Sequence, residues 1–301
     1  MDRSIQVCNI LSRIVVGGMF RSDYSTKSLR RNMNLISAIP QAVLKRRSPT
    51  TEIEAVNIDG LEAEFISTQA NHAGILLYLH GGGYFMGSIA THRRSAWEVS
   101  HHCNLKVLLI NYRLAPEHPY PAALDDAKKA YRFLKNKFPH LPVSVGGDSA
   151  GGGLSLALTM ALRDEGEPLP ARLFAVSPWA NLNVEGESIK RNHANDFWLK
   201  EKVLKRWASL YFAKNAPHQP YISPALGSFE KFPPFLIFCG DQEILQSDSE
   251  QVFDKAKKAG VNVKLHIGKN MQHVWFLAFP FLAESKRAFL ALQEFFGSSN
   301  E

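Results

Sequence analysis

From residue 52 onward, short apolar runs alternate along the chain with longer segments of helical periodicity. Such alternation is typical of a parallel sheet with helices on both faces, and it predicts the α/β class. Buried strands are predicted at 74–80, 106–111, 143–147, 172–177, 234–240 and 261–267. Helices are predicted at 91–103, 121–138, 150–164, 246–259 and 282–296. Two more strands, at 52–57 and 61–67 with Asp59-Gly60 between them, form an antiparallel hairpin and complete an eight-stranded sheet.

Two segments do not fit this alternation. Residues 1–45 precede the sheet, and residues 185–225 separate two strands by more than a simple crossover needs. Long excursions from a compact domain are usually functional, so we expect a cap over the carboxyl ends of the strands, where open α/β sheets bind ligands. The main domain is then 46–301, with 185–225 as its cap insertion. The insertion carries one helical apolar stripe, formed by Trp198, Leu199, Val203, Leu204, Trp207 and Tyr211.

The pentapeptide Gly147-Asp148-Ser149-Ala150-Gly151 matches G-x-S-x-G between a predicted strand and a predicted helix. This strand–turn–helix setting is the one that a nucleophile elbow requires, and it makes Ser149 the candidate nucleophile. A second glycine-rich motif, His80-Gly81-Gly82-Gly83, follows the strand at 74–80. Backbone N–H groups of this loop and of Ala150 can form an oxyanion hole. A phosphate loop is excluded because no G-K-[ST] follows.

The general base for Ser149 is expected late in the chain, because this arrangement places its partners in the order Ser, acid, His. His273 lies just past the last predicted strand, at the end of the sheet where Ser149 emerges. His266 lies inside that strand, so we expect it to pack sideways. His80 is interpreted as an orienting residue. The histidine spacings suggest no metal site.

Further motifs extend the pattern through Tyr112-Arg113-Leu114-Ala115-Pro116-Glu117-His118-Pro119 and Pro121-Ala122-Ala123-Leu124-Asp125-Asp126. With H-G-G-G and G-D-S-A-G, they make the chain resemble the hormone-sensitive-lipase-like (bacterial family IV) esterases of the α/β-hydrolase fold over nearly its whole length. The resemblance implies oxyanion donors at Gly81, Gly82 and Ala150. It also implies a cap built from an N-terminal segment and an insertion after the sixth strand, and it is compatible with a homodimer.

The acid of the triad departs from the family pattern. Where the family has D-P-L-x-D, this chain reads Gly240-Asp241-Gln242-Glu243-Ile244-Leu245-Gln246-Ser247-Asp248. Aligning D-P-L with Glu243-Ile244-Leu245 keeps acid and leucine two residues apart, which favours Glu243, and its extra methylene helps the carboxylate to reach His273. Asp241 and Asp248 are the alternatives, interpreted as a loop-bracing residue and a charge at a helix N-terminus.

These residues predict a serine carboxylesterase that hydrolyses short- to medium-chain esters through an acyl-enzyme, without a metal or an organic cofactor. The bulky side chains of the cap, at Phe197, Trp198, Trp207, Tyr211 and Phe212, favour a modest pocket. The same machinery acting on a lactone, sterol ester or amide is the alternative chemistry. A ligand-binding module without catalysis is the alternative from another class of protein, since fold alone does not establish chemistry.

Charge and cysteine content limit the partners of the chain. The net charge is +7, but its basic residues are scattered and the densest run, at 128–137, has the spacing of a solvated helix face. We therefore expect no nucleic-acid partner. The apolar segment around Ile10–Phe20 is too short for a membrane span. It indicates an amphipathic helix that does not insert stably into a membrane. Three distant cysteines suggest no disulfide framework, which favours a cytoplasmic protein.

Overall fold

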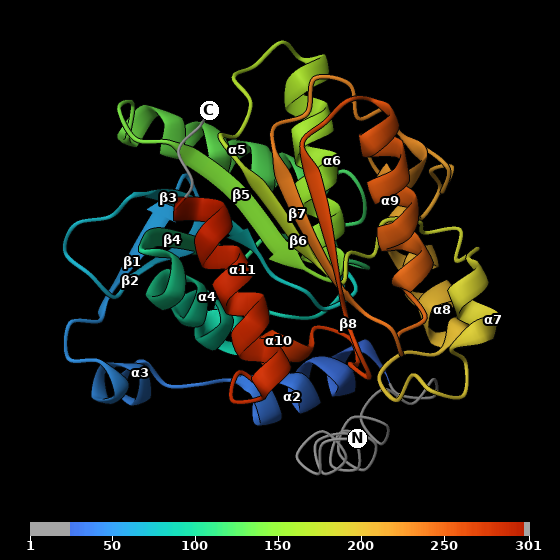
Figure 1. Ribbon diagram of the computed structural model, residues 1–301, viewed down its shortest axis with the longest axis horizontal. Coiled ribbons are helices and arrows are strands. Elements are labelled where there is room, and N and C mark those ends of the chain that lie inside the picture. The colour runs from blue at the N-terminus through green and yellow to red at the C-terminus, as the bar shows by residue number, and fades with distance from the viewer. Residues whose placement is uncertain (1–24, 298–301) are drawn as a thin grey trace.

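The computed structural model describes residues 25–297, and within them eight strands form a single sheet in the order β1-β2-β4-β3-β5-β6-β7-β8 (Figure 1). Strand β2 is antiparallel to both of its neighbours, and all other pairs are parallel. The strands are β1 (Glu52–Ile58), β2 (Leu61–Ser67), β3 (Gly74–Leu79), β4 (Leu105–Ile110), β5 (Val143–Asp148), β6 (Leu173–Val176), β7 (Phe235–Gly240) and β8 (Val263–Gly268). The predicted α/β class and mostly parallel eight-stranded sheet are thus confirmed.

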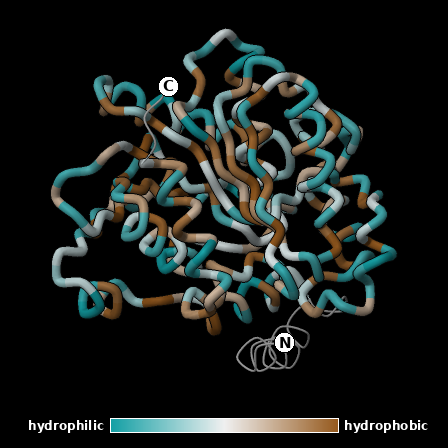
Figure 2. The backbone as a smooth tube through the Cα atoms, viewed as in Figure 1, coloured by the Kyte–Doolittle hydropathy of each residue, from teal (hydrophilic) through white to brown (hydrophobic). Residues whose placement is uncertain are grey.

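The central strands β3 to β7 are apolar because they are covered on both faces, and Figure 2 shows them as a hydrophobic centre. In β3, Ile75, Leu77 and Leu79 face one layer of helices, while Leu76 and Tyr78 face the other. All five side chains are fully buried. Period-two alternation therefore sends every second residue into a different core.

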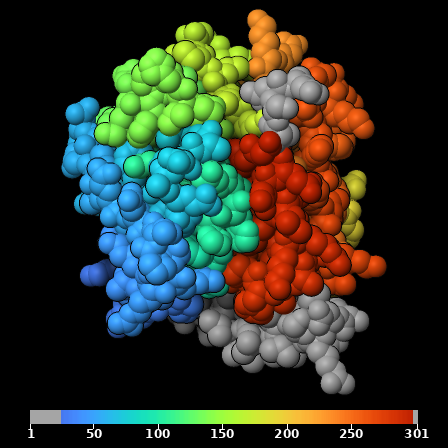
Figure 3. Space-filling model, turned by 60° about the vertical axis from the view of Figure 1, so that its left-hand side comes forward, coloured from blue at the N-terminus to red at the C-terminus, as the bar shows by residue number. Residues whose placement is uncertain are grey.

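Helices α4 (Ile89–Cys103) and α11 (Ala283–Gly297) pack side by side on one face of the sheet (Figure 3). The other face is covered by α5 (Ala122–Lys137), α6 (Ala150–Asp164) and α9 (Gln246–Lys258). These five helices agree with the predicted segments to within two residues at each end. None of the helices in residues 25–297 has the length and apolar character needed to cross a membrane.

The remaining helices are short, and several lie near the carboxyl ends of the parallel strands (Figure 1). They are α2 (Thr26–Ser37), α3 (Gln41–Arg47), α7 (Glu187–Arg191), α8 (Glu201–Phe212), the 3-10 helix η1 (Pro224–Leu226) and α10 (Trp275–Ala278). The predicted helix around Ile10–Phe20 lies outside the described residues.

The single apolar stripe predicted for the insertion is wrong at its start. Helix α8 begins at Glu201, so Trp198 and Leu199 lie in the turn before it. The Asp196 carboxylate accepts hydrogen bonds from both of their N–H groups, at 2.8 and 2.7 Å. This Asx-type capture holds the turn and delays the helix.

Candidate active site

Ser149 lies at the tight turn between β5 and α6, with backbone angles φ 53° and ψ −121°. This left-handed conformation is strained for a residue with a side chain, as a nucleophile elbow requires. The turn also runs against β3: a Cβ on Gly147 or Gly151 would lie 2.2 or 1.9 Å from the Leu79 carbonyl oxygen. The flanking glycines of the motif are therefore sterically required.

His273 joins Ser149 to Glu243 through two hydrogen bonds. Its Nδ1 is 2.6 Å from Glu243 Oε2, and its Nε2 is 2.9 Å from Ser149 Oγ. A carboxylate can only accept, so Nδ1 carries the proton and Nε2 is the bare nitrogen that faces the serine hydroxyl. The three predicted side chains thus form one continuous chain of hydrogen bonds.

The two ionisable side chains of this hydrogen-bonded series are shielded from water, with His273 4% exposed and Glu243 fully buried. Burial lowers the pKa of His273, but its hydrogen bond to Glu243 and the charges of nearby carboxylates outweigh that effect and raise the pKa above 6.5. The carboxylate therefore favours the imidazolium that forms when His273 takes a proton.

Ser177, which sequence reasoning missed, links Glu243 to the backbone next to His273. It follows β6 with φ 48°, and its Oγ donates to Glu243 Oε1 at 2.9 Å while accepting from Val274 N at 3.0 Å. Gly240 N also donates to Glu243 Oε1, at 2.6 Å. The only sequence signal for Ser177 was its place at the carboxyl end of a buried strand.

Asp241 and Asp248, the alternative acids, are engaged elsewhere. Asp241 Oδ1 accepts from Gln242 Nε2 at 2.9 Å. Asp248 lies in the first turn of α9, but the helix-charge interpretation is incomplete because its buried Oδ2 accepts from the N–H groups of Ala180 and Asn181. Burial raises the pKa of Asp248 to about 7.

Asp196 connects the insertion to the loop after β7 that carries Glu243, here called the acid loop. Sequence reasoning missed Asp196 as well. Its Oδ1 holds the turn before α8, while its Oδ2 accepts from Ile244 N at 2.8 Å, next to Glu243. The side chain is fully buried, and burial raises its pKa to about 6. Asn192 adds a second connection, because its Nδ2 donates to the carbonyl oxygen of Glu243 at 2.8 Å.

The H-G-G-G loop folds against the elbow. Gly82 has φ 120°, and a Cβ there would lie 2.3 Å from the Met86 carbonyl oxygen. A Cβ on Gly81 would lie 2.2 Å from Asp148 Oδ2. Ala150 is the first residue of α6, where helix N–H groups have no intrahelical acceptor. The three predicted oxyanion donors therefore belong to two segments in contact beside Ser149.

His80 lies behind this loop as a neutral ring. Its Nδ1 is 2.8 Å from the Gly81 carbonyl oxygen, and it stacks on Tyr112 with 4.1 Å between centroids. Burial, followed by the neighbouring charge of His92, lowers its pKa to about 3. His266 packs on Phe238 from β8, as expected for a residue inside the last strand.

A pocket of about 500 Å³ opens at Ser149 and His273. Its walls come from α2 and the segment that follows, from the turn before α8 and α8 itself, and from α4 and α10. The lining includes Met33, Ile36, Ile39, Thr91, Arg94, Trp198, Leu199, Trp207, Leu277 and Phe279. Of the five bulky side chains expected to close it, Trp198 and Trp207 line the pocket, whereas Phe197, Tyr211 and Phe212 are not in its lining. Tyr211 instead stacks on Tyr84 at 3.7 Å.

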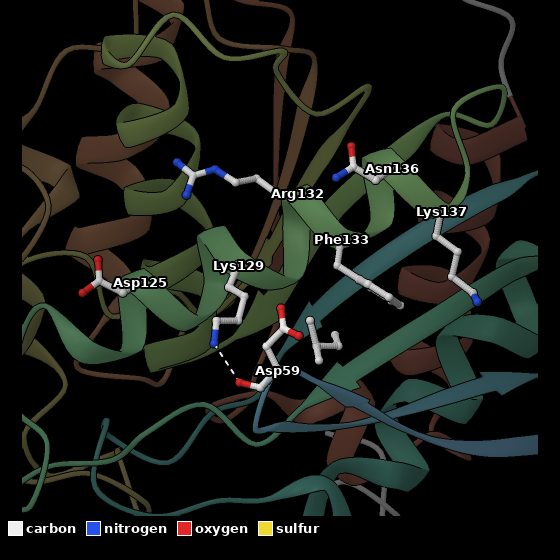
Figure 4. A pocket seen from close by; sticks show the side chains of 8 residues that line it. Asp59, Asp125, Lys129, Arg132, Phe133, Asn136 and Lys137 are labelled. Atoms are coloured by element: carbon white, nitrogen blue, oxygen red, sulfur yellow. Dashed lines mark hydrogen bonds between the residues drawn. The ribbon is translucent and has the colours of Figure 1, made fainter.

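A second hollow, of about 630 Å³, lies between α5 and the β1–β2 turn (Figure 4). Two of its basic groups already have partners: Lys129 Nζ donates to the Asp59 carbonyl oxygen, and Arg132 pairs with Glu165 and Glu167. Ser149, His273 and Glu243 are not among the residues that line it. The basic run of α5 is the solvated helix face that its spacing predicts.

Comparison with known proteins gives consistent matches. A family model described as the alpha/beta hydrolase fold matches residues 76–277. An acetyl-hydrolase from Streptomyces hygroscopicus is 39% identical over 236 residues, which cover 78% of this chain and 79% of that protein. A solved structure of an esterase/lipase from an uncultured bacterium is 34% identical, with a TM-score of 0.88 and 98% of both chains covered. A solved esterase of the bacterial hormone-sensitive lipase family is 34% identical, with a TM-score of 0.84 and 95% and 97% covered.

Proposed function

This chain belongs to the hormone-sensitive-lipase-like esterases of the α/β-hydrolase fold and is a carboxylic ester hydrolase, and we propose that Ser149, His273 and Glu243 are its catalytic triad. The observation that carries the assignment is the hydrogen-bonded chain from Ser149 Oγ through the His273 ring to Glu243, with distances of 2.9 and 2.6 Å.

In the proposed reaction, Ser149 Oγ attacks the ester carbonyl carbon while His273 Nε2 takes its proton. Glu243 holds the imidazole in the tautomer with Nδ1–H and stabilises the imidazolium. The N–H groups of Gly81, Gly82 and Ala150 donate to the developing oxyanion, and each such donor is typically worth about 10²–10³ in rate. The imidazolium then protonates the leaving alcohol, and water attacks the acyl-enzyme with His273 again as base.

Replacing the nucleophile tests this proposal. We expect Ser149→Ala to lose nearly all turnover of 4-nitrophenyl butyrate and all labelling by a fluorophosphonate, with an unchanged circular dichroism spectrum. The matched control is Ser209→Ala, since Ser209 is exposed on α8 and bonds only locally to the Arg206 carbonyl oxygen. Turnover by Ser149→Ala above a tenth of wild type would contradict the assignment.

We also propose that residues up to 45 and the 185–225 insertion act as a cap that selects short- to medium-chain acyl groups. The contribution of Met33, Trp198 and Trp207 to one pocket supports this proposal. The pocket volume of about 500 Å³ lies within the usual range for small ligands, about 300–1,000 Å³. Turnover of 4-nitrophenyl esters should be highest at about C4–C8; comparable turnover of C16 esters with activation at a lipid interface would refute the cap proposal.

A homodimer and a cytoplasmic location are further proposals. Strand β8 is at the edge of the sheet with Ile267 45% exposed, and such edges are suited to pairing with a second copy. Light scattering that gives a monomer mass at micromolar concentration would refute the dimer. The cytoplasmic location is supported by Cys103 and Cys239, which are both free and buried. Fractionation that recovers the protein outside the cytoplasm would refute it.

A further inference from the structure

The pocket beside Ser149 contains a guanidinium without a hydrogen-bond acceptor among the described residues. Arg94 of α4 lines the pocket with its side chain 37% exposed, and its Nε atom is buried and has no hydrogen-bond acceptor. The carboxylate oxygen that it approaches, Glu98 Oε1, is 3.8 Å from Nε, which is beyond hydrogen-bond distance. A buried N–H left without an acceptor is costly and calls for an explanation.

The charge of Arg94 is also poorly compensated, because Glu98 is committed elsewhere. Glu98 Oε1 accepts from Arg47 Nη1 at 2.9 Å, and Glu98 Oε2 is 3.8 Å from His102 Nε2. One carboxylate therefore serves two arginines, and the closer contact belongs to Arg47. The adjacent Arg93 shows the contrast, since it pairs with both carboxylate oxygens of Glu64.

No other acid in the pocket compensates Arg94. Among the pocket residues, Asp148 carries the only carboxylate, and its oxygens face the Tyr78 hydroxyl at 2.7 Å and His92 Nε2 at 3.5 Å. Burial alone would raise the pKa of Asp148, but His92 and Tyr78 outweigh it and lower that pKa. Arg94 therefore has no carboxylate partner among the pocket residues, and Glu98 at 3.8 Å on its own helix is the acid that it approaches.

Arg94 marks a polar region in a largely apolar pocket. Thr91 and Ser95 from α4 line the pocket with it. The same pocket is bounded by apolar side chains of α2 and α10, and Figure 1 shows these two helices close to α4. A substrate chain that extends from Ser149 into the pocket would thus contact apolar walls and the Arg94 guanidinium, whose N–H donors have no acceptor among the described residues.

We propose that Arg94 is a subsite for an anionic group of the substrate, so that the preferred esters carry a carboxylate away from the scissile bond. The inference rests on the proposed function, because it takes Ser149 as the reacting group. A guanidinium suits this ligand, since its planar set of donors matches both oxygens of a carboxylate. The carboxylate can belong to the acyl chain or to the alcohol, and substrate pairs separate the two.

The first pair compares mono-4-nitrophenyl glutarate with 4-nitrophenyl pentanoate, which tests the acyl side. The second compares 4-(acetoxymethyl)benzoate with benzyl acetate, which tests the alcohol side. In at least one pair we expect a higher kcat/KM for the charged member, and Arg94→Gln should lower the charged-to-neutral ratio about tenfold or more. The control Arg132→Gln removes the same charge from α5, on the opposite face of the sheet, and should leave both ratios unchanged.

Ratios that Arg94→Gln leaves unaltered in both pairs, or a wild-type preference for both neutral esters above tenfold, would overturn the subsite. If Arg94→Gln does not fold, Arg94→Lys and the salt dependence of the wild-type ratio decide: the lysine variant should keep part of the preference, and the preference should fall as salt screens the charges. If the wild type hydrolyses neither neutral ester, the proposed function fails instead. Calorimetric binding of monomethyl glutarate then tests the subsite alone, and equal affinity in wild type and Arg94→Gln would refute it.

Discussion

Replacing Glu243 by glutamine isolates the role of the buried acid, because the amide keeps the shape of the side chain and removes its charge. Glu243 Oε1 accepts two hydrogen bonds, from Gly240 N and Ser177 Oγ, while Oε2 accepts one from His273. Glutamine has one oxygen, so it can satisfy only one of these two sides.

The balance of hydrogen bonds decides which side keeps the oxygen. If the amide oxygen turned toward His273, the amide NH₂ would face the Gly240 N–H, which can only donate, and a buried donor left unpaired costs about 1–3 kcal/mol. Keeping the oxygen toward Ser177 preserves two bonds and places the NH₂ against Nδ1. His273 must then accept at Nδ1 and carry its proton on Nε2, in the tautomer that cannot take the proton of Ser149.

We expect Glu243→Gln to lower kcat on 4-nitrophenyl butyrate by about 10⁴, the loss that follows when an orienting carboxylate no longer sets the tautomer. That factor corresponds to roughly 5.4 kcal/mol in the activation barrier. Asp241→Asn is the matched control, because Asp241 bonds to its neighbour Gln242 and not to His273. A crippled Asp241 variant, or a Glu243 variant within tenfold of wild type, would refute the reasoning.

Two further predictions test the electrostatics and the connection between segments. Because only neutral imidazole can act as base and Glu243 raises the pKa of His273, kcat/KM should rise with pH through a midpoint above 6.5. A pH profile with its midpoint below that value would show that burial outweighs the carboxylate. Asp196→Asn should lower the free energy of unfolding by about 1–3 kcal/mol in urea titrations, since one amide oxygen cannot serve the N–H groups on both sides. In the control Asp164→Asn the changed carboxylate is 43% exposed, pairs with Arg163 and accepts from the Tyr221 hydroxyl, and its loss should cost less than about 1 kcal/mol. Equal stability of the two variants would contradict the role given to Asp196.

The sheet could be predicted from sequence because its signal is local and repeated. Each buried strand is a short apolar run bounded by polar or glycine residues, and burial on both faces removes any ambiguity about which face must be apolar. The hairpin at Asp59-Gly60 could also be predicted, since Asp-Gly favours the two-residue turns in which both residues have positive φ. In the structure these φ angles are 47° and 89°. Helix α8 was predicted to start too early because side-chain capture by Asp196 competes with the helix, and periodicity does not record that competition.

The residues of the candidate site could be predicted from sequence only where they belong to a known motif. Ser149 and the glycines around it form one continuous sequence motif. Steric contact with β3 explains why no larger residue fits at the glycine positions Gly147 and Gly151. Ser177 and Asp196 carry no motif, because their roles depend on which loops meet in space. Their partners lie 66 and 48 residues further along the chain, at Glu243 and Ile244.

The acid loop shows how far alignment could go and what the fold adds. Register with the family pattern favoured Glu243 over Asp241 but left the choice open, since both follow the same buried strand. In the structure the difference is one of surroundings. Glu243 is fully buried between donors from Gly240, Ser177 and His273, whereas Asp241 is partly exposed and bonds to its neighbour. A charged carboxylate survives full burial only when such donors surround it, so the same donors that compensate its desolvation also hold it against the base.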